Sequence, residues 1–366
     1  MTLTTFNNRV FGLDIFRAIA ITTVVLVHGG VLLNNTRFSD FPYIPLVSGV
    51  DWFFVLSGFL IGVILLKTIN QPEPFGYKDL FQFWKRRWFR TLPNYYLILV
   101  VNIIFVKYGV IKEDYTQFNW KFFFFLQNFS YEFMGFFWES WSLAVEEWFY
   151  IISPILLLLS LKFFPTKISF VLVTILMLII PLIYRLSIRT TSIDGFWFDV
   201  KFAKVVVARL DSIAYGLLAS WVFYYYGTVW VKYKVHVLVL GIVLTYFVLH
   251  YGADVTTFYR QIVCLSIGPF AASLFLPFAE GIKTGKGIFA KAITHISKIS
   301  YSMYLVNLAV VLEVITTNFP AQGGKDGIIK YLIYWLVVIA LSTIIYNYFE
   351  KPIMDLRDKR KDAISH

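Results

Sequence analysis

The stretch LDIFRAIAITTVVLVH, residues 13–28, decides the fold class, because it places two ionisable side chains inside a long apolar run. Arg17 and His28 are separated by ten mostly apolar residues. On an α-helix, eleven steps of 100° return to within about 20° of the starting direction, so both side chains lie on one face, about 16 Å apart. Ionisable residues in membrane spans are costly and usually functional. The pair therefore predicts a site that works through the thickness of a bilayer.

The composition of the 366-residue chain is that of an integral membrane protein. Hydrophobic residues make up 58% of it, and the mean hydropathy is +0.68. Several apolar runs of about 20 residues are long enough to cross the hydrocarbon core as helices, and they lack the alternation of a membrane β-barrel. The net charge of +11 is distributed along the chain in a way that favours membrane topology over nucleic-acid binding. We predict an all-α integral membrane protein that does not bind nucleic acid.

Ten apolar runs predict about ten transmembrane helices. They lie near residues 13–33, 46–66, 91–109, 142–161, 168–188, 205–226, 235–251, 259–279, 299–318 and 329–349. A shorter apolar piece near residues 120–130 is too short to cross and predicts a re-entrant segment. Residues 1–350 form the predicted transmembrane domain, and residues 351–366 form a basic cytoplasmic tail.

The distribution of lysine and arginine predicts the orientation. With both termini inside, the inner regions hold 21 of the 33 residues and the outer regions hold 11, Arg185 among them, while Arg209 lies within a span. This bias predicts that both termini are cytoplasmic. Arg17 is then near the inner face and His28 in the outer half. The side chains expected near the level of His28 are Asp51, Glu146, Glu147, Arg209 and Asp211.

His28 is the strongest candidate for chemistry. Imidazole titrates near neutrality and its free nitrogen can take a proton from a hydroxyl, so His28 is a candidate general base or acyl acceptor. We expect Glu146 or Asp51 to orient the ring. The alternative is an interfacial histidine that is hydrogen-bonded to a loop.

Arg17 and the segment KRRWFR, residues 85–90, are candidate anion-binding groups. Guanidinium forks grip phosphate oxygens, and Arg87 and Arg90 can face one way on a helix. The predicted phosphate-binding residues are Arg17, Arg86, Arg87 and Arg90. The alternatives are membrane anchoring, with Arg17 paired to Asp14, and the binding of anionic lipids.

Other residues in these motifs have structural interpretations. Gly58 and Gly62, four apart, favour close helix packing in lipid. Ser142 could cap the fourth span, and Glu147 could pair with Arg209, since buried charges seek partners. The sequence contains no zinc-ligand spacing and no phosphate-cradling glycine loop, so we predict no metal site.

Together these motifs resemble the acyltransferase 3 family of integral-membrane acyltransferases. The resemblance covers nearly the whole chain. It rests on the Arg17–His28 spacing and on the motifs at residues 51–62, 86–93, 141–150, 209–216, 299–305 and 350–352, which occur in family order. Members often carry a histidine just after the stretch that ends at Leu305, where this chain has Asn307. Some relatives have an additional carboxy-terminal hydrolase-like domain, which we do not expect here.

The resemblance implies an O-acyltransferase that moves an acyl group, most often acetyl, from cytoplasmic acetyl-CoA to a hydroxyl. It also implies that Arg17 and His28 form the functional motif. The implied acceptor is a carbohydrate or lipid-linked glycan of the cell envelope, and the implied location is a multi-pass position in a bacterial inner membrane, in contact with membrane lipids. The alternative is a transporter that exports a small metabolite or an acylated product, which inverted repeats would favour; none is evident in the sequence.

Overall fold

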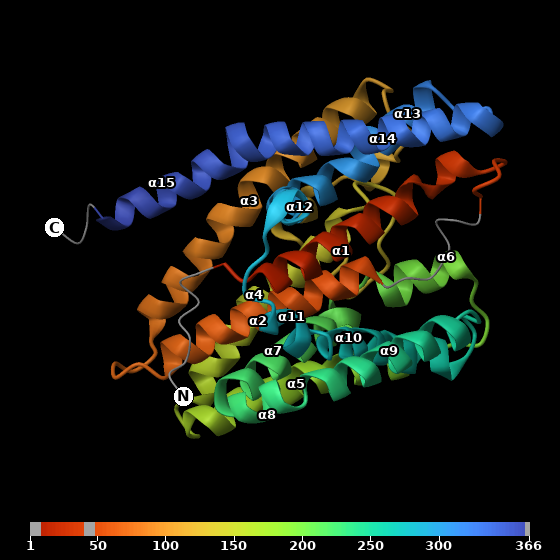
Figure 1. The fold of residues 1–366 in the computed structure, drawn as a ribbon. Helices are drawn as coiled ribbons and strands as arrows, with labels where there is room; N and C mark the ends of the chain where they lie inside the picture. The colour runs from red at the N-terminus through yellow and green to blue at the C-terminus, as the bar shows by residue number, and fades with distance from the viewer. Residues whose placement is uncertain (1–8, 40–47, 363–366) are drawn as a thin grey trace.

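The computed structural model describes residues 9–39 and 48–362, and every regular element in these residues is helical (Figure 1). The first half of the chain contains α1 (Phe11–Gly29), α2 (Gly49–Ile69), α3 (Tyr77–Lys107), α4 (Ser140–Ser160), α5 (Thr166–Ser187) and α6 (Gly195–Phe198). The second half contains α7 (Val206–Tyr225), α8 (Gly227–Lys232), α9 (Lys234–Tyr251), α10 (Leu265–Ser273), α11 (Leu276–Gly281), α12 (Gly287–Val306), α13 (Glu313–Asn318), α14 (Gly324–Ile345) and α15 (Lys351–Asp362). The all-α prediction is confirmed.

Short 3₁₀ and π-helical turns join or extend these helices. The 3₁₀ turns are η1 (Gly30–Leu33), η3 (Tyr115–Gln117) and η4 (Trp120–Phe124), and the π-helical turns are η5 (Asp199–Ala203), η6 (Tyr259–Cys264), η7 (Asn307–Leu312) and η8 (Tyr346–Glu350). The π turns η6, η7 and η8 lie within long helical runs. They lengthen the last three spans beyond what their α-helical parts would give.

In the described part of the chain, ten helical segments are long and apolar enough to cross a membrane, as predicted. Each of them overlaps one expected span, but several ends differ. The third segment begins at Tyr77 and the ninth at Gly287, well before the expected residues 91 and 299. Residues 46 and 47 of the expected second span lie outside the described residues. The early start of α3 matters for the site, because it places the 85–90 segment inside a helix.

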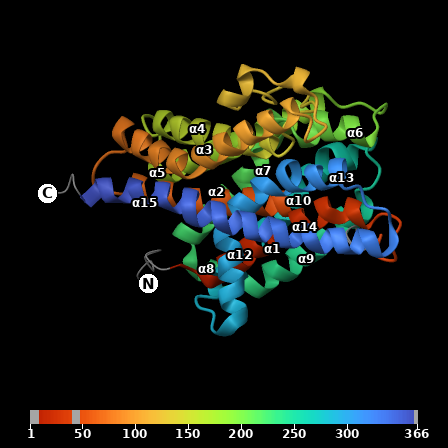
Figure 2. The same ribbon diagram turned by 90° about the horizontal axis from the view of Figure 1, so that it is seen from above.

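The helices α1 and α2 run through the middle of the bundle. The helices α3, α12 and α14 lie on one side of them, and α5, α7, α9 and α10 lie on the other (Figures 1 and 2). In both views α1 begins and α15 ends toward the same end of the bundle, as an even number of spans requires. The residues that follow Ile345 continue the direction of α14 as η8 and α15.

The contact between α2 and α7 is made backbone to backbone. A Cβ atom on Gly58 would lie 2.0 Å from the carbonyl oxygen of Ile213, and one on Gly216 would lie 2.0 Å from that of Val55. Gly62 is equally crowded by the Ser220 hydroxyl. Small residues permit this close approach in lipid, so the predicted packing role of Gly58 and Gly62 is confirmed.

The segment between α3 and α4 does not cross the bundle but folds back along both helices. The Tyr95 hydroxyl of α3 donates to the carbonyl of Phe122 (2.8 Å), and the Trp148 indole of α4 donates to the carbonyl of Phe125 (2.9 Å). Tyr95 lies twelve residues before the end of α3, about 18 Å along the axis. The segment therefore penetrates well below the helix ends, in keeping with the expected re-entrant piece.

Candidate active site

The opening pair of residues lies on α1, with Arg17 in its second turn and His28 in its last. Eleven residues of helix separate them by about 16 Å along the axis. Arg17 lines an internal cavity. His28 lies beyond this cavity, toward the end of the helix, and its ring is hydrogen-bonded to another span.

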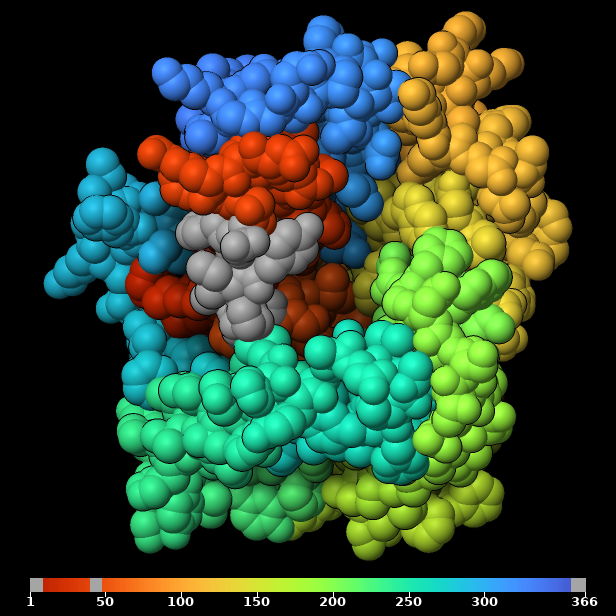
Figure 3. All heavy atoms as spheres, turned by 90° about the vertical axis from the view of Figure 1, so that its right-hand side faces the viewer, coloured from red at the N-terminus to blue at the C-terminus, as the bar shows by residue number. Residues whose placement is uncertain are grey.

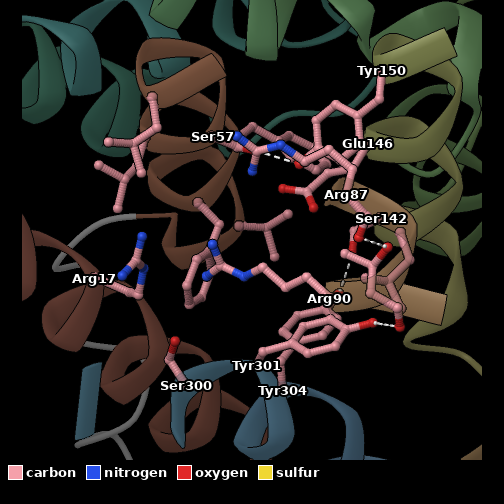
Figure 4. A pocket seen from close by; sticks show the side chains of 17 residues that line it. Arg17, Ser57, Arg87, Arg90, Ser142, Glu146, Tyr150, Ser300, Tyr301 and Tyr304 are labelled. Carbon is pink, nitrogen blue, oxygen red and sulfur yellow. Dashed lines mark hydrogen bonds between the residues drawn. The ribbon is translucent and has the colours of Figure 1, made fainter. Parts of the chain in front are cut away.

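The cavity with Arg17 lies between α1, α2, α3, α4 and α12 and has a volume of about 760 Å³, the open space at its mouth included (Figure 4). Arg17 extends into it from one side, and Arg87 and Arg90 extend into it from the other. Its other polar lining residues are Ser57, Thr91, Ser142, Glu146, Tyr150, Ser300, Tyr301 and Tyr304. We call this space the central cavity.

The three arginines of the central cavity, Arg17, Arg87 and Arg90, make no salt bridge within the described residues. Glu146 is the one carboxylate among the lining residues that the structure describes. The guanidinium of Arg87 lies 5.6 Å from the ring centre of Tyr150, a cation–π distance. Because charges away from water need a partner, this excess of positive charge suits an anionic ligand.

A second cavity adjoins the central one at Arg87 and Arg90, which line both. It lies between the end of α2 and the first half of α3, where Thr68, Asp79 and Arg86 also line it. The predicted cluster therefore divides between two adjoining cavities. Arg17 belongs to the central cavity alone, Arg86 to the second cavity alone, and Arg87 and Arg90 to both.

The imidazole of His28 has an amide partner instead of the carboxylate that we expected. Its Nδ1 lies 2.6 Å from Oδ1 of Asn307, at the start of η7. Glu146 lines the central cavity with Arg17, and Asp51 is paired elsewhere, so the prediction that one of them orients the ring is wrong. Hydropathy could not reveal the true partner, because Asn307 lies at the junction of an α-helix and a π turn.

The buried charges near α7 are paired differently from the prediction. Arg209 forms its salt bridge with Asp51 of α2, whereas Glu147 accepts a hydrogen bond from the Thr91 hydroxyl (2.7 Å). Arg185, assigned above to the outer regions, is completely buried in α5, where it lies 2.7 Å from Asp211. Periodicity alone does not show which of several nearby opposite charges meet.

The alternative interpretation of Arg17, a pair with Asp14, is wrong. Asp14 accepts from Arg9 (2.5 Å) and from the Ser297 hydroxyl (2.8 Å). Ser142 does not cap α4, which begins at Ser140; its hydroxyl lies 2.5 Å from that of Tyr304. Arg17 and Ser142 both line the central cavity.

We expected Asp51 and Glu146 to lie at the level of His28, away from the basic cluster at residues 85–90. The structure agrees for Asp51 but not for Glu146. Since α3 begins at Tyr77, Arg87 and Arg90 lie ten and thirteen residues inside it, about 15–20 Å from its start. The basic cluster therefore reaches the depth of Glu146. Asp51, in the first turn of α2, lies toward the same end of the bundle as His28.

A buried polar contact that the sequence did not reveal joins α3, α12 and η8. Glu350 accepts from the Ser302 hydroxyl (2.7 Å) and from the Asn94 amide (2.9 Å). Ser302 and Glu350 each lie in a motif that carries the family resemblance. The partner Asn94, beside Pro93, is recognisable only once α3 is seen to continue through the proline.

A third cavity lies toward the end of the bundle that holds His28, and it shares Val50 with the central cavity. Figure 3 shows this end of the molecule, with the end of α1 above α9 and with α6 to the right. The described residues that line this third cavity include the ion pair of Asp51 and Arg209. They also include the aromatic rings of Trp52, Trp141, Phe196 and Phe198. We call it the outer cavity.

The fold and the site together define a multi-pass membrane protein with an arginine-lined cavity inside its helical bundle. The chain belongs to the acyltransferase 3 family, since the model of the family's acyltransferase domain matches residues 10–347.

Two curated relatives from Staphylococcus aureus show the range of similarity. The O-acetyltransferase OatA of strain NCTC 8325 / PS 47 is 25% identical over 374 residues, which cover 93% of this chain and 57% of OatA. A putative O-acetyltransferase of strain COL is 34% identical over 169 residues, 41% of this chain and 26% of that protein. The chain thus spans little more than half the length of OatA. No solved structure gives a significant match.

Proposed function

We propose that this protein is a membrane O-acyltransferase, which transfers an acetyl group from acyl-CoA to a hydroxyl of an envelope glycan. The observation that carries the proposal is the central cavity, where Arg17, Arg87 and Arg90 converge without salt-bridge partners in the described chain. His28 lies on the same helix as Arg17, about 16 Å further along. Family membership and the similarity to OatA support the reaction class.

The donor enters from the end of the bundle that holds the start of α3, which is the cytoplasmic end by our topology. Its phosphates bind Arg86, Arg87 and Arg90, because guanidinium groups form paired hydrogen bonds with phosphate oxygens. The pantetheine arm then passes Arg17 through the central cavity. Arg87 and Arg90 line both cavities, so they lie on the route of the donor.

His28 acts as the general base. Its Nε2 accepts the proton of the acceptor hydroxyl while that oxygen attacks the thioester carbonyl carbon. The tetrahedral intermediate then breaks its carbon–sulfur bond. The departing thiolate receives the proton from the imidazolium, which leaves an acetyl ester, free CoA and neutral His28.

The acceptor binds in the outer cavity. Its aromatic rings, with those of Trp52 and Trp141 among them, offer flat apolar faces, while Asp51 and Arg209 offer hydrogen-bonding groups. This combination suits a carbohydrate. In this assignment Asp51 helps to bind the acceptor, and Glu146 balances the arginines of the central cavity.

The test is acetyl transfer by protein reconstituted in lipid vesicles with labelled acetyl-CoA. We expect His28→Gln to lower kcat by about 10²- to 10⁴-fold, the usual contribution of a general base. His295→Gln is the matched control, since His295 is exposed and bonds only to Thr343 among the described residues. Wild-type turnover by folded His28→Gln protein would exclude the base assignment.

The same assay separates an enzyme from a transporter. Three adjoining cavities along a bundle also suit the passage of a solute. A transporter releases no CoA from acetyl-CoA, whereas the proposed enzyme releases one CoA for each ester that forms. CoA release that is absent in the wild type, with transport of acetylated product intact, would favour the transporter.

A further inference from the structure

Asn307 is the fully buried residue that contacts the His28 ring, and it begins the π-helical turn η7. We propose that Asn307 is a positioning residue that fixes His28 as the Nδ1–H tautomer, so that Nε2 carries the reactive lone pair. This inference rests on the proposed role of His28 as the base. It assigns Asn307 a task that neither the family match nor the relatives indicate.

The orientation of the Asn307 amide follows from its other contacts. Its Nδ2 donates to the backbone carbonyls of Tyr304 (2.7 Å) and Met303 (3.0 Å). If the amide were reversed, its oxygen would face two carbonyl oxygens and both hydrogen bonds would be lost. The amide oxygen must therefore point toward His28.

This orientation determines which nitrogen of His28 carries the proton. An amide oxygen only accepts hydrogen bonds, so Nδ1 of His28, 2.6 Å away, must be the donor. In the neutral ring the other nitrogen, Nε2, then holds the lone pair. Histidine in water favours the opposite tautomer, so the contact with Asn307 selects a form that the isolated side chain populates less.

The backbone around Asn307 is held by a second span. The N–H of Ala309, two residues further along η7, donates to Oε1 of Glu139 (2.6 Å), at the start of α4. Glu139 is 2% exposed. π-helical turns are rare and occur frequently at functional sites. Here the turn frees a backbone donor, and Glu139 uses it to anchor the segment that presents Asn307.

The hydroxyl of Tyr334 adds a further contact from α14. It donates to the carbonyl of Val25 (3.2 Å) and lies 3.4 Å from Oδ1 of Asn307. The amide oxygen thus accepts from His28 of α1 and lies close to a hydroxyl of α14, whose single proton goes to Val25. These contacts leave the Asn307 side chain little freedom to rotate away from the His28 ring.

The experiment compares wild type with Asn307→Leu in lipid nanodiscs by ¹⁵N NMR of labelled histidine. The His28 signals are identified by their loss in His28→Gln protein. We expect wild type to show a protonated Nδ1 and a bare Nε2, and Asn307→Leu to show the reverse. We also expect kcat to fall at least about 10-fold, as for other groups that orient a functional imidazole, with an unchanged KM for acetyl-CoA.

Thr343→Val is the matched control, because it removes the polar partner of His295 and leaves His28 untouched. A wild-type His28 with a protonated Nε2, or an Asn307→Leu protein with the wild-type tautomer and kcat, would overturn the proposal. The NMR readout is independent of turnover, so it tests the tautomer even if His28→Gln retains activity and the base assignment fails.

A second pair of variants keeps the proposal testable if Asn307→Leu does not fold. Glu139→Gln retains an oxygen that can accept from Ala309, whereas Glu139→Ala does not. We expect the tautomer of His28 to be unchanged in Glu139→Gln and mixed in Glu139→Ala. The same single tautomer in both variants would contradict the anchoring role of Glu139.

Discussion

Buried arginines are accommodated in opposite ways on the two sides of α2. On the α7 side, Arg185 and Arg209 are each paired with an aspartate that the protein supplies. On the cavity side, Arg17, Arg87 and Arg90 have no such partner among the described residues. A buried charge without its partner is costly. The comparison teaches that the protein's own aspartates neutralise the first two arginines, while the proposed function assigns the neutralisation of the other three to an anion that arrives with the substrate.

The largest expected effect in this comparison is the loss of a paired arginine. Arg185→Met leaves the Asp211 carboxylate buried without its cation, so we expect the free energy of unfolding to fall by about 3–5 kcal/mol. Thermal unfolding in detergent measures the loss. The double variant Arg185→Met with Asp211→Leu should recover at least half of it. A single variant as stable as the wild type would remove the contrast between the two sides.

An arginine of the central cavity should behave in the opposite way. Arg87→Met removes a charge that no protein carboxylate neutralises within salt-bridge distance in the described chain, so we expect stability to be unchanged or higher. Hydrogen bonds to charged groups contribute about 1.5–3 kcal/mol, so KM for acetyl-CoA should rise about 10- to 100-fold. Unchanged donor kinetics, together with a large loss of stability, would place Arg87 with the structural arginines.

The smallest effect concerns an acidic group that is buried without a cation. Burial, with Glu113 and Glu313 nearby, raises the pKa of Glu139 from its ordinary value of 4.5 to about 8. The folded state then binds more protons than the unfolded state, so the contribution to stability is complete below about pH 4.5 and is lost as the pH rises through about 8.

Glu139→Gln removes this titration and retains an acceptor for Ala309. Between pH 5 and pH 8, we expect the unfolding free energy of the wild type to fall by about 1 kcal/mol or more relative to that of the variant. The melting temperature of the wild type should fall with it. Parallel melting curves across this range would show that Glu139 does not titrate there.

The sequence was sufficient to predict an all-α bundle of ten spans, because each membrane span is a long apolar run that hydropathy detects. It also predicted that Arg87 and Arg90 share one face of a helix, since helical spacing determines which side chains share a face; that this face meets Arg17 of α1 is known only from the structure. The pairing of Arg209 with Asp51 instead of Glu147 depended on how three helices cross, which a local pattern does not encode.

The partner of His28 was hidden for a different reason. Asn307 faces the ring from the first residue of a π turn, whose wider spacing changes the direction of every side chain that follows. A helix of uniform period assigns the residues after Asn307 to the wrong face, and Asn307 itself stood out only as the position where family members often carry a histidine. The start of α3 was missed because the polar residues of its first turns lowered the hydropathy, although they continue the same helix.

The glycine contacts between α2 and α7 have a mechanical consequence. Backbone packed against backbone at Gly58 and Gly216 leaves no side chains that could repack, so neither helix can slide past the other without collision. The two helices therefore form one rigid unit. The central cavity lies against α2, so any widening of this cavity must come from the opposite wall, which α3, α4 and α12 provide.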